Sequence, residues 1–223
     1  MSEATFENRP FLHLRATYGY DLVMRLLGAL WFLGLAIFTA FTMTNANNTP
    51  TSLLAKSCLV MFYLIFCLLI SIRPRAKAQA YGFLPRLAAF VGTYMPWTMV
   101  FFAALTNSAL LNLMSSVCVI AGMALAIFTV LHLGKAFSLV PQARMLVRSG
   151  PYRWLRHPLY VCEEIAVFGT LLQFPSPITA LIFATHIGIQ VCRIIYEEKL
   201  LRETFPEYRE YSASTWRLIP FVW

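Results

Sequence analysis

Six long apolar runs limit what this chain can fold into. A helix needs about 20 mostly apolar residues to cross the hydrocarbon core of a bilayer. Runs that approach this length cover residues 22–43, 53–72, 87–105, 110–132, 158–173 and 178–196. Because 59% of the residues are hydrophobic and only 13% are charged, little sequence is left for a separate soluble domain. The sequence therefore predicts an all-α, polytopic integral membrane helical bundle with about five to six spans.

The last two runs are expected to form a C-terminal helical hairpin. The fifth run is short, and the sequence FPSP at residues 174–177 joins it to the sixth. Whether this hairpin crosses the membrane fully is left open by the sequence. Residues 197–223 then predict a helix extension and an amphipathic cytoplasmic tail. Its aromatic residues are expected at the level of the lipid headgroups, and they are Tyr208, Tyr211, Trp216, Phe221 and Trp223.

Lys and Arg residues alternate with apolar runs in a way that predicts the orientation of the chain. Arg9 and Arg15 precede the first run, and further basic clusters lie between the second and third runs and between the fourth and fifth. Residues 44–52 and 106–109 contain no Lys or Arg. This bias predicts that both termini and the 133–157 loop are cytoplasmic. We therefore interpret the net charge of +8 as a topology signal, with membrane lipids and not nucleic acid as the expected partners.

The embedded ionisable residues are unevenly divided along the chain. Residues 1–132 contain four apolar runs with no other strong signal, and we expect an N-terminal transmembrane region there. Residues 133–223 contain most of the ionisable groups that lie in or beside apolar runs. Any chemistry is therefore predicted in this C-terminal region, and the aromatic residues of the second and third runs are expected to pack or to contact lipid.

A first candidate constellation spans residues 144–164 and ends with the sequence GPYRWLRHPLYVCEE. Pro158 can begin a helix, because its missing N–H costs nothing in a first helical turn. Arg156 and His157 then lie at a helix N-terminus, where backbone N–H groups favour an anion. Tyr152 and Tyr160 flank this position with rings suited to stacking on a flat heterocycle. A basic loop that only contacts lipid headgroups is the alternative.

A second constellation is RIIYEE, residues 193–198. Arg193 and Glu197 are four residues apart, so they share a helix face and can pair. Charges near the inner boundary of a membrane are costly and indicate function by default. A self-satisfied ion pair is one alternative, and pairing of Arg193 with Glu163 or Glu164 across the hairpin is another.

Other signals for chemistry are weak. His132 and His186 are isolated on apolar runs, without HxxH or HExxH spacing, and are expected to be satisfied bundle histidines. The five cysteines are expected to be free thiols in apolar runs. The sequence therefore predicts no metal site, and it leaves the oligomeric state open.

The two constellations resemble those of a known family. The stretches RMLVRSGPYRWLRHPLYV, RIIYEEKLLRETFPEYREY and LIP are similar to those of the isoprenylcysteine carboxyl methyltransferase family and its phospholipid N-methyltransferase relatives. The resemblance covers about residues 133–221. It implies an integral membrane methyltransferase that uses S-adenosylmethionine and a lipophilic acceptor, either an isoprenylcysteine carboxylate-like compound or a lipid.

The resemblance also implies roles for particular residues. It places Arg193 near the reacting centre, and it has Glu197 and Glu198 hold charged and hydroxyl groups of the cofactor, so Arg193 and Glu197 are the candidate catalytic pair. The remaining residues implied to line the cofactor pocket are Leu146, Val147, Gly150, Tyr152, Arg156, His157 and Tyr160. Two departures from the family pattern are Arg144, where His is common, and Cys162, where Gly is common. The change at Arg144 bears on the substrate more than on the cofactor.

The chemistry of the residues agrees with this interpretation. Arg156 suits a carboxylate, Glu197 or Glu198 suits an ammonium or a diol, and a tyrosine ring suits adenine. A carboxylate nucleophile needs no base, whereas an amine or thiol must lose a proton, for which Glu163 and Glu197 are possible acceptors. Two alternatives remain at this point: an NADPH-dependent membrane reductase of the sterol-reductase type, and a non-enzymatic lipid-binding or scaffold protein.

Overall fold

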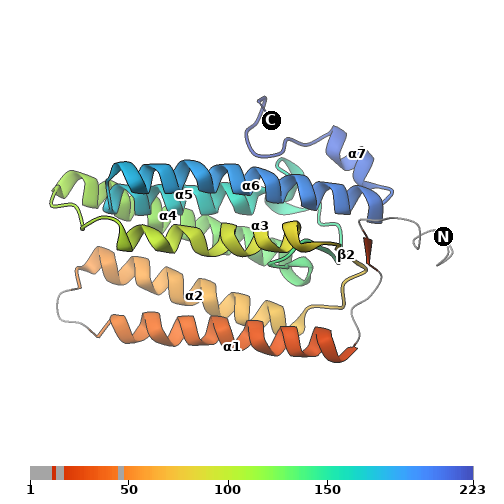
Figure 1. Cartoon of the computed structure of the whole chain (residues 1–223), viewed down its shortest axis with the longest axis horizontal. Coiled ribbons are helices and arrows are strands. Elements are labelled where there is room, and N and C mark those ends of the chain that lie inside the picture. The colour runs from red at the N-terminus through yellow and green to blue at the C-terminus, as the bar shows by residue number, and fades with distance from the viewer. Residues whose placement is uncertain (1–11, 14–17, 45–47, 223) are drawn as a thin grey trace.

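The computed structural model in Figure 1 describes residues 12–13, 18–44 and 48–222. Arg9, Arg15 and Trp223, which entered the predictions on topology and on the tail, lie outside the described residues. The helices are α1 (Tyr18–Thr42), α2 (Pro50–Ile72), α3 (Phe83–Tyr94), η2 (Met95–Phe101, a 3-10 helix), α4 (Ala109–Leu133), η3 (Gly134–Ala136), η4 (Gly150–Arg153), α5 (Pro158–Gln173), α6 (Pro177–Thr204) and α7 (Tyr208–Ala213).

The structure confirms an all-α membrane bundle. Helices α1, α2, α4 and α6 are each long and apolar enough to cross a bilayer. Helix α3 with η2, and helix α5, lie alongside these four helices with their axes roughly parallel to them (Figure 1). The predicted third run is split at Met95, because Pro96 lacks the N–H that a continuing α-helix would need.

The predicted C-terminal hairpin is present, with arms of unequal length. Helix α5 has 16 residues, whereas α6 has 28 and extends well past the end of its apolar run. The FPSP segment supplies the helix start, because Ser176 and Thr179 form a reciprocal capping box and Pro177 occupies the first turn. Helix α6 is therefore long enough to span, and α5 falls short of the length of a full span.

Helices α4 and α5 approach each other unusually closely at two glycines. A Cβ atom on Gly122 would lie 2.7 Å from the backbone nitrogen of Ala166, and one on Gly169 would lie 2.9 Å from the carbonyl oxygen of Ser115. Small residues let helix backbones approach in a membrane, where apolar side chains gain little from leaving lipid. The two glycines thus allow α5 to pack directly against α4.

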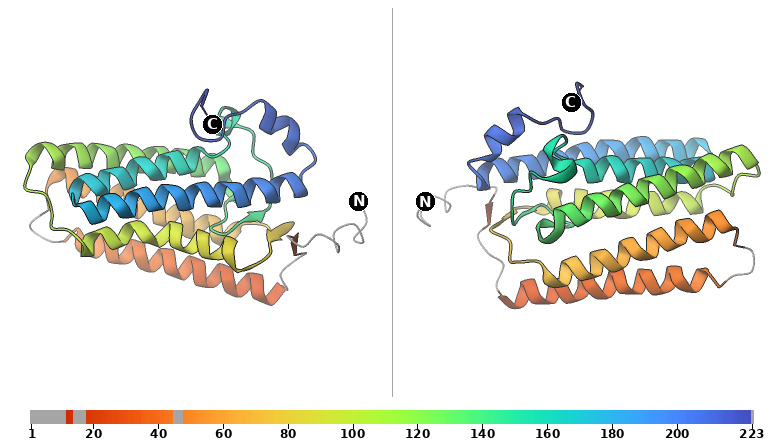
Figure 2. Two further views of the ribbon diagram at one scale, coloured as in Figure 1. Left: turned by 45° about the horizontal axis from the view of Figure 1, so that its top comes forward. Right: turned by 180° about the vertical axis from the view of Figure 1, so that it is seen from behind.

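A small antiparallel sheet closes one end of the bundle. Strand β2 (Ala78–Ala80) lies between β1 (Leu12–His13) and β3 (Gln142–Ala143), with Ala80 opposite Leu12 and Ala78 opposite Ala143. The sheet, the loop after α4 and helix α7 all gather at this end, as the two further views confirm (Figure 2). The sequence did not predict this sheet, whose strands are only two or three residues long.

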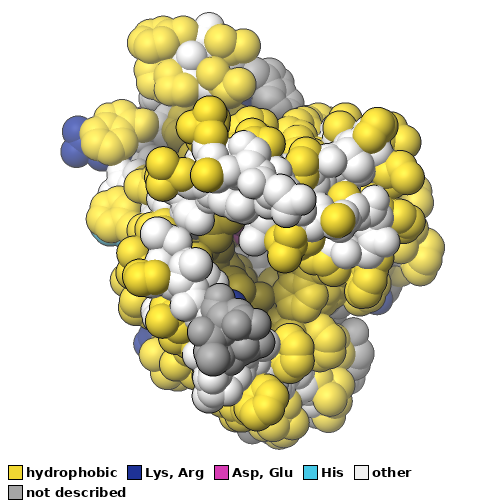
Figure 3. Space-filling model, turned by 90° about the vertical axis from the view of Figure 1, so that its left-hand side faces the viewer, with side chains coloured by type: hydrophobic (Ala, Val, Ile, Leu, Met, Phe, Trp, Pro, Cys, Tyr) yellow, Lys and Arg dark blue, Asp and Glu magenta, His cyan; other side chains and the backbone are white. Residues whose placement is uncertain are grey.

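The remaining surface is largely apolar. Exposed side chains such as Leu30, Ile37 and Leu181 face outward along the helices. Figure 3 shows the end opposite α7, where hydrophobic side chains surround a central hollow. Such an exterior matches a chain surrounded by lipid, and the apolar core around Phe66 and Val130 lies inside the bundle.

One expectation about the tail is wrong. Tyr208 and Tyr211 do not lie at the headgroup level as exposed residues, because their exposed fractions are 0% and 6%. Helix α7 is only six residues long and folds back against the end of the bundle, whereas Phe221 remains 87% exposed. An aromatic pattern is the same for a membrane-surface tail and for a segment that packs on its own protein, so the sequence could not separate the two.

Candidate functional site

A cavity of about 650 Å³ runs through the bundle and is lined by residues from both halves of the chain. Its volume lies within the range of about 300–1,000 Å³ that is usual for ligand sites. At one end the wall is charged and aromatic, with residues from the 134–157 loop, α5, α6 and α7. Toward the other end the wall is apolar and includes Phe38, Phe62 and Trp97 from α1, α2 and η2.

Helix α5 shows this gradient along one face. Its lining residues recur at intervals of three or four, which is the spacing of a single helix face. In chain order they are Leu159, Tyr160, Glu163, Ala166, Val167 and Thr170. Helix α6 runs antiparallel and contributes Glu197, Arg193 and His186 at successive depths. The α5 side of the wall therefore becomes mostly apolar beyond Glu163, whereas the α6 side stays polar to the depth of His186.

Tyr152 and Gly150 show how the loop is built. Gly150 has a φ of 59°, and a Cβ there would clash with the ring of His132, so a glycine is required. The turn carries Tyr152 into a buried position that lines the cavity. Burial raises the pKa of Tyr152 well above its ordinary value. Gly150 itself supports the loop and does not line the cavity.

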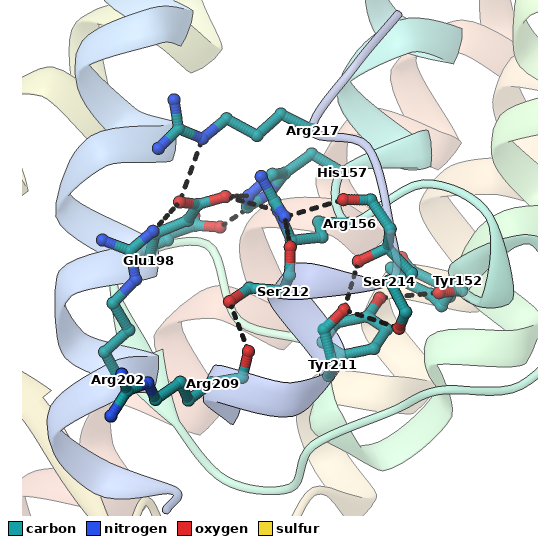
Figure 4. A network of polar contacts seen from close by, with 12 residues as sticks. Tyr152, Arg156, His157, Glu198, Arg202, Arg209, Tyr211, Ser212, Ser214 and Arg217 are labelled. Carbon is teal, nitrogen blue, oxygen red and sulfur yellow. Dashed lines mark hydrogen bonds and ion pairs between the residues drawn. The ribbon is translucent and has the colours of Figure 1, made fainter. Parts of the chain in front are cut away.

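Arg156 and Glu198 form the centre of a polar network that fastens the tail (Figure 4). Nε of Arg156 lies 2.8 Å from Oε1 of Glu198. Nη1 of Arg156 donates to the carbonyl oxygens of Ser212 at 2.5 Å and Thr215 at 2.8 Å. Glu198 is 2% exposed and also accepts from Arg217 at 3.1 Å. The two residues implied to hold a cofactor thus hold the chain's own C-terminal segment, and only Arg156 lines the cavity.

Backbone hydrogen bonds tie the same loop to the tail. The N–H of Arg156 donates to the carbonyl of Trp216 at 2.7 Å, and the N–H of His157 donates to that of Arg217 at 3.1 Å. The hydroxyl of Tyr211 donates to the carbonyl of Tyr152 at 2.6 Å. The backbone N–H groups of the two residues that precede α5 are therefore satisfied by the tail.

Glu197 faces the cavity and is oriented by an aromatic residue. The hydroxyl of Tyr160 donates to Oε1 of Glu197 at 2.5 Å, and Nδ1 of His157 lies 3.9 Å from its Oε2. These three residues line the polar end of the cavity. One carboxylate oxygen of Glu197 is thus engaged by Tyr160, while the side chain stays partly accessible, with an exposed fraction of 23%.

Neither of the ion pairs that the sequence left open for Arg193, with Glu197 or with Glu163 or Glu164, is formed. Within the described part of the chain, Arg193 has no carboxylate oxygen within 4.0 Å; its Nη1 donates to Oε1 of Gln190 at 2.8 Å. Its guanidinium carbon lies 4.9 Å from the centre of the Tyr160 ring. Gly92 of α3 makes room for this position, because a Cβ there would lie 2.8 Å from Cδ of Arg193. The spacing of the two residues did not reveal these competing partners.

A second polar cluster lies deeper, between α5 and α6. Nε2 of Gln190 donates to Oε2 of Glu163 at 3.1 Å. Nδ1 of His186 lies 3.0 Å from Oε1 of Glu164, and its Nε2 lies 2.9 Å from the carbonyl oxygen of Gly92. His186 is thus tied to α3 through Nε2, whereas its Nδ1 has only the ionic contact with Glu164 and no hydrogen bond among the described residues. Gln190 and Gly92 carried no sequence signal, since each has its role only through a neighbouring helix.

Arg144 lies beside the cavity and not in its wall. Its side chain donates to the carbonyl oxygen of Pro74 and, at 2.5 Å, to Oε1 of Gln142. Burial and the nearby Arg73 lower its pKa to about 10. Arg144 thus ties β3 to the chain that leaves α2. The implied site residues that do line the cavity are Leu146, Val147, Tyr152, Arg156, His157, Tyr160, Arg193 and Glu197.

Comparison with known proteins places the chain. Residues 103–208 match the family model described as phospholipid methyltransferase. The cobalt-zinc-cadmium resistance protein CzcN of Cupriavidus metallidurans is 34% identical over 76 residues, which cover 34% of this chain and 35% of that protein. Protein-S-isoprenylcysteine O-methyltransferase B of Arabidopsis thaliana is 30% identical over 131 residues, 56% of this chain and 66% of that protein.

A solved structure shares the fold. The eukaryotic intramembrane Ras methyltransferase ICMT superposes with a TM-score of 0.54 at 19% sequence identity, covering 92% of this chain and 84% of the other. This likeness shows the fold alone, which is that of a polytopic helical membrane bundle. Over its C-terminal half the chain is similar to protein-S-isoprenylcysteine O-methyltransferases and to the phospholipid methyltransferase family model. The sequence match spans only about a third of the length of CzcN.

Proposed function

We propose that this chain is a membrane-embedded, S-adenosylmethionine-dependent methyltransferase that acts on a lipophilic acceptor. One observation carries the proposal: a single cavity joins a charged and aromatic end to an apolar chamber among the membrane helices. A polar cofactor and an apolar acceptor can meet only where such regions are continuous. The methyltransferase names of relatives such as the Arabidopsis proteins support the same activity.

The groups at the polar end fit S-adenosylmethionine. Glu197 offers a partly accessible carboxylate for an ammonium or a ribose diol, and the rings of Tyr152 and Tyr160 offer surfaces for adenine. The hydroxyl of Tyr208, fully buried and in the cavity wall, has no hydrogen-bond partner among the described residues. Such a buried unpartnered hydroxyl calls for a ligand or water group. Tyr208 is thus a candidate binding residue, which the aromatic pattern of the tail had assigned to the lipid headgroups.

The residues that line the cavity would then align the acceptor with the methyl group of the cofactor and exclude water. When bound, the cofactor supplies an electrophilic methyl group on a sulfonium. Methyl transfer requires in-line placement of the nucleophile, so positioning and water exclusion supply much of the rate. Arg193, held by Gln190 and the Tyr160 ring, lies in the cavity wall between the ionic and apolar parts. Its place suits the orientation of the acceptor's head group.

We further infer that the polar end of the cavity faces the cytoplasm. Helix α1 begins and α6 ends at the end of the bundle that carries α7 (Figure 1). The basic loop lies at this same end, which agrees with the positive-inside bias. A cytosolic cofactor would then enter at the tail, and membrane lipids or a lipophilic substrate would enter from the bilayer.

Methyl transfer from tritiated S-adenosylmethionine into a total lipid extract tests this function. We expect label in the organic phase with the purified protein, and at least about a tenfold loss in Glu197→Gln, which corresponds to about 1.4 kcal/mol. Glu210→Gln is the matched control, because Glu210 is exposed on α7. Equal labelling in Glu197→Gln would remove that residue's role.

The reductase alternative finds no support among the relatives reported above. It makes one distinct prediction, which is that NADPH raises the melting temperature of the purified protein. We expect S-adenosylmethionine to raise it and NADPH to leave it unchanged, because binding to the native state stabilises a protein by mass action. Stabilisation by NADPH alone would contradict the proposed function.

A further inference from the structure

Glu163 lies on α5 between the ionic and the apolar part of the cavity wall. On the lining face of α5, Tyr160 precedes it by one turn at the ionic end, and Ala166 and Val167 follow it by one turn at the apolar end. Arg193 of α6 lines the same region. A lipophilic acceptor that fills the apolar chamber would bring its polar head to this boundary, so the side chain at 163 is positioned to meet the reacting atom.

The position of the Glu163 carboxylate is controlled through a bridging amide. Arg193 donates from Nη1 to Oε1 of Gln190 at 2.8 Å, and Gln190 donates from Nε2 to Oε2 of Glu163 at 3.1 Å. The two contacts define which way the amide of Gln190 points, because a guanidinium only donates and a carboxylate accepts. Oε1 of Glu163 accepts no hydrogen bond from the described residues. The bridge thus holds one oxygen and leaves the other for a ligand.

The neighbouring acidic residues are already engaged. Oε1 of Glu197 accepts from Tyr160, and Glu198 is bound by Arg156 and Arg217 outside the cavity lining.

Glu164 is engaged by His186. Because Nε2 of His186 faces a carbonyl oxygen, which only accepts, this nitrogen carries a proton. Nδ1 of the same ring lies 3.0 Å from Oε1 of Glu164, and Glu164 does not line the cavity. Glu163 and Glu197 each line the cavity with one oxygen that accepts no hydrogen bond from the described residues. Glu197 lies at the ionic end, where the proposed function assigns it to the cofactor, so Glu163 is the carboxylate left to meet the acceptor.

We propose that Glu163 is a catalytic residue that accepts the proton of an amine or thiol nucleophile carried on a long apolar chain. The inference rests on the proposed methyltransferase function and names the acceptor class for that site. A carboxylate embedded in a membrane wall is costly and marks a functional position. A carboxylate acceptor would instead bring a second anion to Glu163 and has no proton to give up.

The proposed step balances. The proton on the nitrogen or sulfur of the acceptor moves to Oε1 of Glu163, and the lone pair on that atom forms a bond to the methyl carbon. The bond between the methyl carbon and the sulfonium breaks, and its electron pair stays on sulfur. The products are the methylated amine or thioether, neutral S-adenosylhomocysteine and protonated Glu163, which returns its proton to water when the site opens.

Three acceptors with similar tails test the proposal: hexadecylamine, N-palmitoylcysteine methyl ester and N-palmitoylglycine. They present an amine, a thiol and a carboxylate. We expect the wild type in lipid nanodiscs to methylate the amine or the thiol faster than the carboxylate. Glu163→Gln should lower kcat on that acceptor by about 100-fold, the lower end of general-base effects, while the Kd for S-adenosylmethionine stays within about twofold. Glu164→Gln is the matched control, and we expect its kcat per folded protein to stay within about threefold.

The pH profile separates proton transfer from a structural defect. Above the pKa of the thiol acceptor, about 8.5 for a cysteine, the thiolate needs no base, so the rate of Glu163→Gln should recover. The titratable or charged groups facing Glu163 are Arg193 and His186 from α6, Tyr160, Cys162 and Glu164 from α5, and Tyr152 from η4. Helix α4 places Cys118 and His132 beside Gly169 and Gly150 instead. These neighbours are unchanged in Glu163→Gln. Recovery of its rate at high pH would therefore reflect ionisation of the acceptor thiol.

Several results would overturn the inference and leave the proposed function standing. They are transfer to N-palmitoylglycine alone, an unchanged kcat in Glu163→Gln, or an equal loss on all three acceptors without recovery at high pH. Absence of transfer to any of the three, with S-adenosylmethionine bound, would likewise remove the acceptor class. Failure of the wild type to bind S-adenosylmethionine would instead contradict the proposed function itself.

Discussion

The contact between α4 and α5 and the contact between the loop and the tail are held together by opposite means. At Gly122 and Gly169 the two helix backbones meet with no side chain between them. At the other contact, Arg156, Glu198 and Arg217 join segments that are far apart in sequence. Within lipid, close approach of helices replaces the hydrophobic effect. At the end of the bundle, buried ions with several hydrogen bonds hold irregular chain in place.

This difference bears on function, because the cavity lies between the two contacts. The α4–α5 contact supports the helix that carries Tyr160 and Glu163, whereas the tail supplies Tyr208 and Tyr211 to the ionic end. A fault in the first should disturb the whole bundle. A fault in the second should release the tail and open the polar end, while the membrane helices stay folded.

The largest expected effect comes from removing the acid at the centre of the tail network. Glu198→Ala leaves Arg156 buried without its carboxylate, and breaking a buried pair in this way costs about 3–5 kcal/mol. We expect the tail after residue 205 to become sensitive to limited proteolysis, with the helical circular dichroism largely retained. A protected tail in this variant would show that the backbone pairing with residues 154–157 suffices.

A bulky residue at the helix contact tests the other region. Gly122→Val forces a side chain against the backbone of Ala166 and should lower the free energy of unfolding by about 1–3 kcal/mol. Gly188→Ala is the matched control, because a Cβ at this α6 position meets nothing within 4 Å. There we expect a gain of about 0.5–1 kcal/mol from the better helix former. Unfolding in mixed micelles measures both, and an equal loss in the two variants would contradict close packing at Gly122.

Alkaline pH should release the tail before the bundle. Burial raises the pKa of Tyr211 from its ordinary 10 to about 12, so its neutral form is favoured in the folded protein. The resulting stabilisation is present below pH 10 and is lost as the pH rises toward 12. Tyr211→Phe removes the hydrogen bond to Tyr152 and should cost about 1 kcal/mol. Tyrosinate absorbance followed against proteolysis of the tail checks this, and Tyr211 that titrates at its ordinary pKa would contradict it.

The smallest effect is expected at the exposed partner of Glu198. Arg202 lies one turn along α6 with its side chain 52% exposed, so its ion pair at 3.0 Å is screened by water. Arg202→Ala should change the free energy of unfolding by no more than about 0.5 kcal/mol. A loss as large as that of Glu198→Ala would mean that the network depends on the exposed arginine and not on Arg156.

Much of this architecture is predictable from the sequence. Apolar runs of bilayer length give the long helices, and the FPSP segment gives the start of α6, because both follow from local chemistry. The split at Pro96 and the sheet of β1, β2 and β3 were not predicted. A strand of two or three residues has no periodicity to detect, and its partners lie more than 60 residues apart.

The site divides in a similar way. Arg156, Tyr160, Arg193 and Glu197, which the two motifs singled out, line one cavity, and their roles stay a prediction. The sequence did not show that Glu198 turns away to the tail, because adjacent residues on a helix differ by about 100° in direction and no spacing says which one faces a cavity. The partners of Arg193 depend on Gly92 of a distant helix, and a missing side chain gives no signal of its own.

Calorimetric titration of the purified protein with S-adenosylmethionine tests the central claim most directly. If the ionic end of the cavity holds this cofactor, binding should saturate at one site per chain and weaken at least about tenfold, or about 1.4 kcal/mol, in Glu197→Gln. Glu210→Gln should bind like the wild type. A folded protein that shows no saturable binding, or that binds equally well after the change at Glu197, would contradict the account.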